Sequence, residues 1–121
     1  HLEDHLVDLV KNSDVATAQA DNATATATAS AVTGRTNVVC KVDASFTSST
    51  ISKTLTVTIT TVAGAKTIIK DIHGAGAIDF GVFGLQCAAS GTAITAALAA
   101  SGTGGVLGNV SMTYYTTGPN N

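Results

Sequence analysis

The sequence predicts an all-β protein: an antiparallel β-sandwich, jelly-roll-like, of about seven to eight strands, with a short N-terminal amphipathic helix or arm. Between residues 54 and 60 apolar and hydroxyl side chains alternate strictly, which places Leu55, Val57 and Ile59 on one side of a half-buried strand. Similar alternating segments recur about every 8 to 12 residues between turn sequences, which is the pattern of a sandwich. No strand–helix–strand pattern interrupts them.

The first 11 residues predict a short amphipathic helix. Their apolar side chains recur at helical spacing, with acidic residues early and a lysine late, as the helix dipole favours. Because a helix of about three turns is marginal alone, its apolar stripe needs a surface, either this domain or a neighbouring protein. The predicted partner-binding residues are Leu2, Leu6, Leu9 and Val10.

Residues 12–21 lack apolar periodicity and predict a linker, so residues 1–21 form an acidic helix-and-linker arm. This arm carries five acidic residues and one lysine, whereas the rest of the chain carries five basic and three acidic residues. The two parts therefore have different roles.

The predicted sandwich domain spans residues 22–117 and is followed by a tail over residues 118–121. Residues 23–31 alternate alanine with threonine or serine, and their small side chains indicate an edge or swapped strand. Residues 36–46 form a second strand with one apolar face made of Val38, Cys40, Val42, Ala44 and Phe46.

Further strands follow between turns rich in glycine and serine. They span residues 54–62, 66–72, 77–85, 94–98 and 106–115, with Ile78, Phe80 and Val82 sharing one face of the third of these and Val106, Val110, Met112 and Tyr114 one face of the last. The sequence Ala-Ala-Ser-Gly-Thr occurs at residues 88–92 and again at 99–103, so two similar turns flank the strand between them.

Composition limits both the core and the classes of partner. The 121 residues fit one domain, but three Phe, two Tyr and no Trp supply few large core side chains. Oligomerisation or docking on a larger body is therefore expected. The net charge of -2 argues against nucleic acid as a partner, and no apolar stretch is long enough for a membrane span or a signal peptide.

Two further features bear on processing and compartment. The chain begins with His1 rather than Met, so we expect that preceding residues were removed, are not included or were replaced. Cys40 and Cys87 either pair or are both small buried residues, and the second reading is favoured because Cys40 lies in phase with neighbouring valines.

Candidate metal and phosphate sites are weak. His1 and His5 lie one helical turn apart beside Glu3 and Asp4, but the motif of a zinc protease is absent and a solvated helix face explains them better. The glycine clusters at 74–76 and 101–105 lack the residues of a phosphate loop and indicate turns. Two glycosylation patterns, at 22–24 and 109–111, are short enough to arise by chance.

Catalytic constellations are also incomplete. Asp71 and His73 lie two residues apart, but no serine occurs in a nucleophile-elbow motif, and His73 fits a hairpin. Asp43 and Asp79 could act as paired carboxylates, although nothing in the sequence brings them together. The sequence therefore predicts no enzyme, no catalytic residues, no cofactor and no metal.

Four segments between Cys40 and Tyr115 resemble small β-sandwich structural proteins of tailed bacteriophages, used as capsid decoration or head-associated proteins. The similar segments are Val-Asp-Ala-Ser-Phe, Lys-Thr-Leu-Thr-Val-Thr-Ile, Ala-Ala-Ser-Gly-Thr-Gly-Gly and Val-Leu-Gly-Asn-Val-Ser-Met-Thr-Tyr-Tyr-Thr. Together they extend over about two-thirds of the chain, and each consists of strand and turn chemistry, so they support the fold more than the function.

The resemblance implies a virion protein on the capsid surface. Such a decoration, or cement, protein binds the assembled shell, often as a homotrimer, and stabilises it by bridging major capsid protein subunits. The arm of residues 1–21 lies outside the resemblance and is expected to contribute to docking or to trimer exchange.

Two alternatives come from other classes of protein. A receptor- or carbohydrate-binding module of a tail fibre or cell-surface protein would need exposed aromatic side chains, and adjacent Tyr114 and Tyr115 point to opposite faces, leaving one at most. A small hydrolase would need an acid, a base and a nucleophile that the motifs do not assemble. Glycan binding would favour the first alternative and measurable turnover the second.

Overall fold

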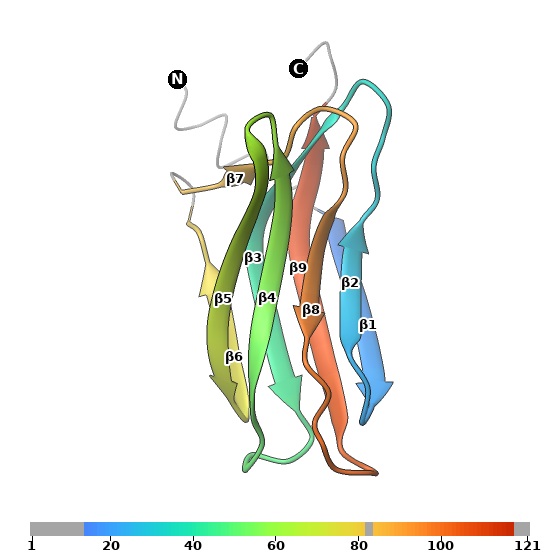
Figure 1. Cartoon of the computed structure of the whole chain (residues 1–121), viewed down its shortest axis with the longest axis vertical. Helices are drawn as coiled ribbons and strands as arrows, with labels where there is room; N and C mark the ends of the chain where they lie inside the picture. Colours follow the sequence, from blue (N-terminus) through green and yellow to red (C-terminus); the bar gives the residue numbers. More distant parts are fainter. Residues whose placement is uncertain (1–13, 82–83, 118–121) are drawn as a thin grey trace.

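Two antiparallel sheets pack face to face in a β-sandwich, which confirms the predicted fold class (Figure 1). This computed structural model describes residues 14–81 and 84–117, and these residues form nine strands and no helix. The predicted helix with Leu2, Leu6, Leu9 and Val10 and the tail over residues 118–121 lie outside the described residues. The described part contains no helix long and apolar enough to cross a membrane.

The first sheet has the strand order β1-β9-β3-β6, with β7 beside β3. Its strands are β1 (Asp14–Asp21), β3 (Thr36–Phe46), β6 (Ala75–Asp79), β7 (Gln86–Cys87) and β9 (Leu107–Thr117). The second sheet has the order β5-β4-β8-β2 and consists of β2 (Ala25–Ala29), β4 (Ser52–Thr61), β5 (Gly64–His73) and β8 (Ile94–Leu98).

The two sheets join at one side and are open at the other. A single residue pair, His73 with Ala75, links β5 to β6 across the turn at Gly74. At the opposite side β1 and β2 are the last strands of their sheets, and they lie next to each other in Figure 1.

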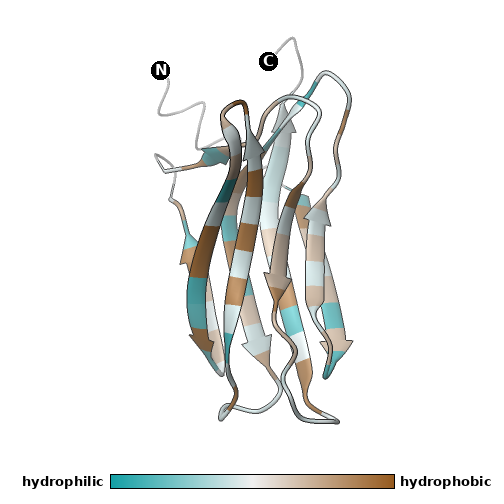
Figure 2. Ribbon diagram, viewed as in Figure 1, coloured by the Kyte–Doolittle hydropathy of each residue, from teal (hydrophilic) through white to brown (hydrophobic). Residues whose placement is uncertain are grey.

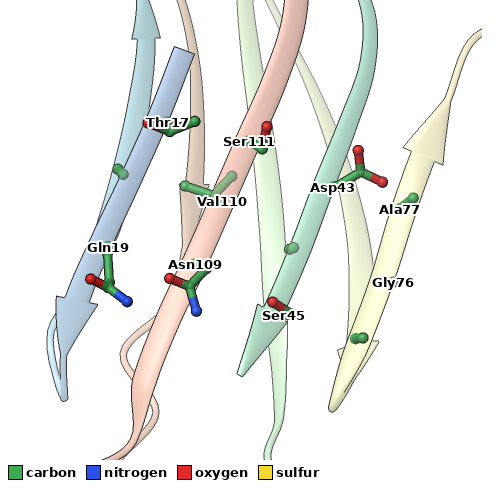
Figure 3. A pocket seen from close by; sticks show the side chains of 12 residues that line it. Thr17, Gln19, Asp43, Ser45, Gly76, Ala77, Asn109, Val110 and Ser111 are labelled. Atoms are coloured by element: carbon green, nitrogen blue, oxygen red, sulfur yellow. The ribbon is translucent and has the colours of Figure 1, made fainter. Parts of the chain in front are cut away.

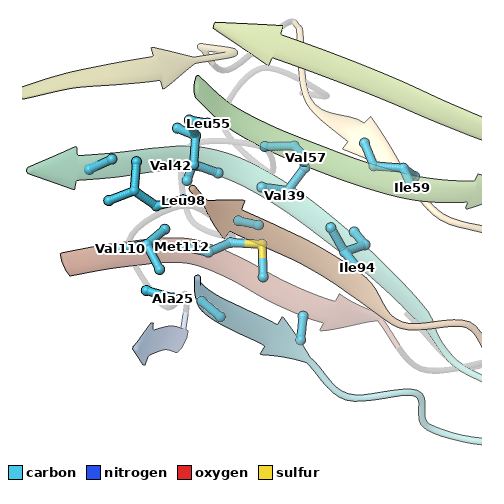
Figure 4. Close-up of a cluster of buried hydrophobic side chains, with 14 of the residues drawn as sticks. Ala25, Val39, Val42, Leu55, Val57, Ile59, Ile94, Leu98, Val110 and Met112 are labelled. Atoms are coloured by element: carbon cyan, nitrogen blue, oxygen red, sulfur yellow. The ribbon is translucent and has the colours of Figure 1, made fainter. Parts of the chain in front are cut away.

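The core lies between the sheets and follows the predicted alternation. Leu55, Val57 and Ile59 are at most 1% exposed, and brown apolar bands alternate with nearly white bands of intermediate hydropathy along β4 in Figure 2. These three side chains pack against residues from both sheets, including Val42, Ile94, Leu98, Val110 and Met112 (Figure 4). The residues expected on one face of the last strand, Val106, Val110, Met112 and Tyr114, belong to this same cluster or pack against it.

A β-bulge in β3 corrects the predicted apolar face of that strand. The register with β9 shifts between Val39 and Lys41, so one extra residue reverses the alternation. Val42, Ala44 and Phe46 face the main core as expected. Val38 and Cys40 lie instead in a second cluster with Tyr115, and Val39 takes the core position.

The linker expected over residues 12–21 is corrected in its described part. Residues 14–21 form β1, which pairs with β9 over its whole length. Ala16, Ala18 and Ala20 pack against the core, so residues 14–21 belong to the sandwich, which was expected to start at residue 22. An alanine strand buries too little area to be recognised alone, and its backbone pairing with β9 stabilises it.

Other boundaries differ in smaller ways. The strand expected over residues 77–85 is β6, which ends at Asp79, followed later by the two-residue β7. The strand of alternating alanine and threonine is β2, an edge strand as predicted. The short segment 94–98 is a strand, β8, between its two similar turns.

Candidate binding groove

A shallow groove of about 860 Å³ lies on the outer face of the first sheet, away from the core. Side chains of β1, β9 and β3 project into it, and the small residues of β6 border it (Figure 3). We call this site the polar groove, after the six polar residues that line it: Thr17, Gln19, Asp43, Ser45, Asn109 and Ser111.

Strand register brings these residues together from distant parts of the chain. Thr17 lies opposite Ser111, and Ser111 lies opposite Asp43. A second row runs parallel to the first and consists of Gln19, Asn109 and Ser45. On β6 the two rows end at Ala77 and Ala75, whose small side chains form only a low border at that end of the groove.

The polar side chains of the groove have no hydrogen-bond partners within the described residues. Asp43 is within 3.6 Å of Lys41 Nζ, and both side chains of this ion pair are about half exposed. By contrast, no buried side-chain nitrogen or oxygen of the described residues lacks a partner. The hydrogen-bonding groups of the polar groove are therefore not used by the fold.

The register also places the candidate carboxylates Asp43 and Asp79 near each other on this face. Asp79 lies opposite Lys41, and Asp43 lies opposite Ala77, so the two acids are diagonal neighbours on β3 and β6. Asp79 also accepts a hydrogen bond of 2.9 Å from the Gly81 amide. Lys41 lies beside both carboxylates, opposite Asp79 and 3.6 Å from Asp43.

His73 and Asp71 lie on β5 of the second sheet, the strand that follows β6 in the strand order. The Ser52 hydroxyl and His73 Nδ1 are 2.6 Å apart across β4 and β5, and both residues are exposed. Asp71 is opposite Thr54, two pairs further along, and makes no described hydrogen bond to His73. The pair links two strands, and no described carboxylate orients the imidazole as a triad requires.

The other sequence candidates occupy turns or lie outside the described residues. His1, Glu3, Asp4 and His5 are outside them, and no group of three or more potential metal ligands occurs in residues 14–81 and 84–117. Gly74 has a φ of 74°, and a Cβ there would lie 2.9 Å from the Ser49 carbonyl oxygen, so the turn requires glycine.

An apolar cluster covers the other end of the same outer face. Val38, Cys40 and Tyr115 are buried there against Leu85. Burial, and then the negative charge of Asp79, raises the pKa of the Cys40 thiol. Burial also raises the pKa of Tyr115, with smaller effects from the two cysteines. Both thiols are free, Cys40 buried and Cys87 exposed, so the expectation that both are buried is correct for Cys40 alone.

Sequence reasoning did not find the polar groove. Its residues come from three strands and lie up to 94 positions apart in the sequence, and only the register joins them. A weak signal existed, because aspartate and asparagine are disfavoured inside strands and yet occur at Asp43 and Asn109.

The chain matches no protein-family model and no curated protein. Its fold is weakly similar to part of an arabinose-bound α-L-arabinofuranosidase, at 15% identity and a TM-score of 0.42, covering 79% of this chain and 18% of that one. It is also weakly similar to the capsid protein in a virus-like particle of the giant freshwater prawn Macrobrachium rosenbergii extra small virus. That likeness has 11% identity and a TM-score of 0.34 and covers 86% of this chain and 77% of that one. Neither likeness assigns a function to this chain.

Proposed function

We propose that this chain is a virion structural protein, a capsid decoration protein that binds the assembled shell and bridges major capsid protein subunits. The observation that carries the proposal is the open side of the sandwich, where β2 is the last strand of its sheet. The sequence resemblance to phage decoration proteins agrees with it. On this proposal the protein acts by binding energy at the capsid surface.

The free edge of β2 is suited to pairing with another chain. Its five residues contain no charge, no proline and no bulge, which are the features that protect edge strands. Ala25, Ala27 and Ala29 are buried in the core, whereas Thr26 and Thr28 are exposed. The strand is held firmly against β8 on one side and offers unpaired backbone groups on the other.

The edge of β1, on the same side of the sandwich, is better protected against strand addition than the edge of β2. It carries Asp14 and Asp21 at its two ends, and both are exposed. Asp21 accepts a hydrogen bond of 2.9 Å from the Gly105 amide, which fixes that end of the strand to the turn before β9. An extended segment of a shell subunit therefore adds to β2 in preference to β1, by strand addition.

In the proposal the segment before β1 also takes part in docking. The predicted apolar residues Leu2, Leu6, Leu9 and Val10 directly precede an edge strand at the open side. In the proposal they contact the shell or a second copy of the chain, and a homotrimer multiplies the contacts. Many weak contacts that act together give firm attachment through effective concentration.

Binding to purified particles tests the proposal. The full chain should co-sediment with shells in proportion to the shell subunits. The double variant Thr26→Lys with Thr28→Lys should lose most of this binding, because charged side chains on an edge strand disfavour the addition of another strand. The matched control, Thr54→Lys with Thr60→Lys, places the same charges on the exposed face of β4 and should bind normally. Binding of only a few copies, or equal binding by both variants, would contradict the proposal.

A further inference from the structure

We infer that the polar groove binds a neutral saccharide. The inference goes beyond the proposed function, because it concerns the outer face of the first sheet and not the open side. The six polar residues defined above have no hydrogen-bond partners of their own among the described residues and cover three adjacent strands.

The chemistry of the groove matches a ligand rich in hydroxyl groups. Serine and threonine hydroxyls and the two amides each donate and accept hydrogen bonds, whereas Asp43 only accepts. A sugar hydroxyl likewise donates and accepts, so each ring position finds a partner in either sense. Six such side chains at one site can form several hydrogen bonds to the same ligand, whereas an isolated surface residue can form only one or two.

The charge and apolarity of the groove exclude other classes of ligand. Asp43 is the only charged side chain that lines it, and Lys41 lies 3.6 Å from its carboxylate, so the groove attracts neither anions nor cations strongly. No aromatic or large apolar side chain except Val110 lines it, and Val110 faces the core. A lipid or an aromatic ligand would gain little there, and a peptide would find no pockets for its side chains.

The size of the groove fits a short saccharide. Three strands span about 10 Å and two side-chain rows about 7 Å, from the usual spacings of a sheet. A mono- or disaccharide covers such an area, and the volume of 860 Å³ is within the usual range of ligand sites. Because no aromatic platform is present, binding by one copy is weak and becomes firm only when many copies act together.

The residue types also favour a role in binding over a role in folding. Asp43 and Asn109 are inside strands β3 and β9, where aspartate and asparagine are less favourable than threonine or valine. Neither makes a hydrogen bond that repays this cost within the described residues. On this inference both residues serve to bind the ligand.

A glycan array tests the inference. The full chain, multimerised through a C-terminal tag, is applied to a printed array of neutral, sialylated and sulfated glycans, and the strongest neutral glycan is then titrated by NMR. Neutral glycans should bind, and the amide shifts should fall on residues 17–19, 43–45 and 109–111. No bound glycan, a preference for acidic glycans or for peptides, or shifts elsewhere on the molecule would overturn the inference.

Isosteric variants localise the site. Thr17→Val removes one groove hydroxyl without changing its shape and should weaken glycan binding by about threefold to tenfold, the usual effect of one hydrogen bond. Asn109→Ala should do the same. Thr58→Val, on the outer face of β4, is the matched control and should change the affinity by less than about twofold. Equal losses in Thr17→Val and Thr58→Val would overturn the assignment of the site, and particle binding by all three variants is expected to stay normal.

Discussion

Two asparagines on neighbouring strands differ in how deeply they are buried and in whether their side chains make hydrogen bonds. Asn37 on β3 is 1% exposed, and its amide group donates to the carbonyl oxygens of Ala29, Ser30 and Thr92. Its side-chain oxygen accepts a hydrogen bond of 2.7 Å from the Thr116 hydroxyl. Asn109 on β9 is half-buried in the polar groove and makes no described side-chain hydrogen bond.

The difference separates polar residues that hold the fold from polar residues that are available to a ligand. Asn37 belongs to the first sheet and binds carbonyls at the end of β2 and before β8, so it ties the two sheets together. Asn109 contributes nothing comparable within the described residues. The same side chain is therefore structural at one site and free at the other, and paired substitutions can test this.

Replacing the buried amide should have the largest effect. Asn37→Ala removes four hydrogen bonds and leaves three carbonyls and one hydroxyl to find new partners, so we expect the free energy of unfolding to fall by about 3 kcal/mol. Denaturant titration of the full chain measures it. Asn109→Ala is the control for the same chemical change and should stay within about 0.5 kcal/mol of the parent protein. Equal losses in the two variants would refute the distinction.

A smaller change in stability is expected when the pH is raised, and it comes from the apolar cluster on the outer face of the first sheet. Burial raises the pKa of Cys40 from its ordinary value of 9.0 and also raises that of Tyr115. The unfolded chain therefore loses these protons at a lower pH than the folded chain, so the stability is complete below about pH 9 and falls as the pH rises towards the raised values.

Unfolding by denaturant at several pH values between about 8 and 10.5 measures this loss. Cys40→Ala removes one of the two groups and should make stability depend less steeply on pH over the upper part of this range. An unchanged slope would show that the thiol does not differ between the folded and unfolded states. The polar groove should keep its glycan binding in this variant, since Cys40 is not among its lining residues.

The sequence predicts a structural feature correctly where the cause of that feature lies within one strand, and not where it lies in the pairing between strands. Leu55, Val57 and Ile59 were placed correctly because alternation and large side chains act within one strand. At Cys40 the same reasoning failed, since a bulge reverses the alternation and depends on the pairing of β3 with β9. Residues 14–21 were assigned to a linker because their alanines become a strand only beside β9.

The groove could not be predicted for the same physical reason. Thr17, Asp43 and Asn109 come together through two registers, β1 with β9 and β9 with β3, and a shift of one residue in either would turn them away from one another. Alternation assigns a residue to a face of its own strand. It does not show which residue of another strand lies beside it.

The smallest effect on stability is the sharpest test of the comparison. Asn109→Thr replaces a residue disfavoured in strands with a favoured one and should raise the free energy of unfolding by up to about 0.5 kcal/mol, as measured by thermal or denaturant unfolding. Glycan binding should weaken in this variant, because the amide group is lost. Stability and binding would then change in opposite directions, as expected of a residue retained for binding at a cost to the fold. A loss of more than about 1 kcal/mol would instead make Asn109 a structural residue like Asn37.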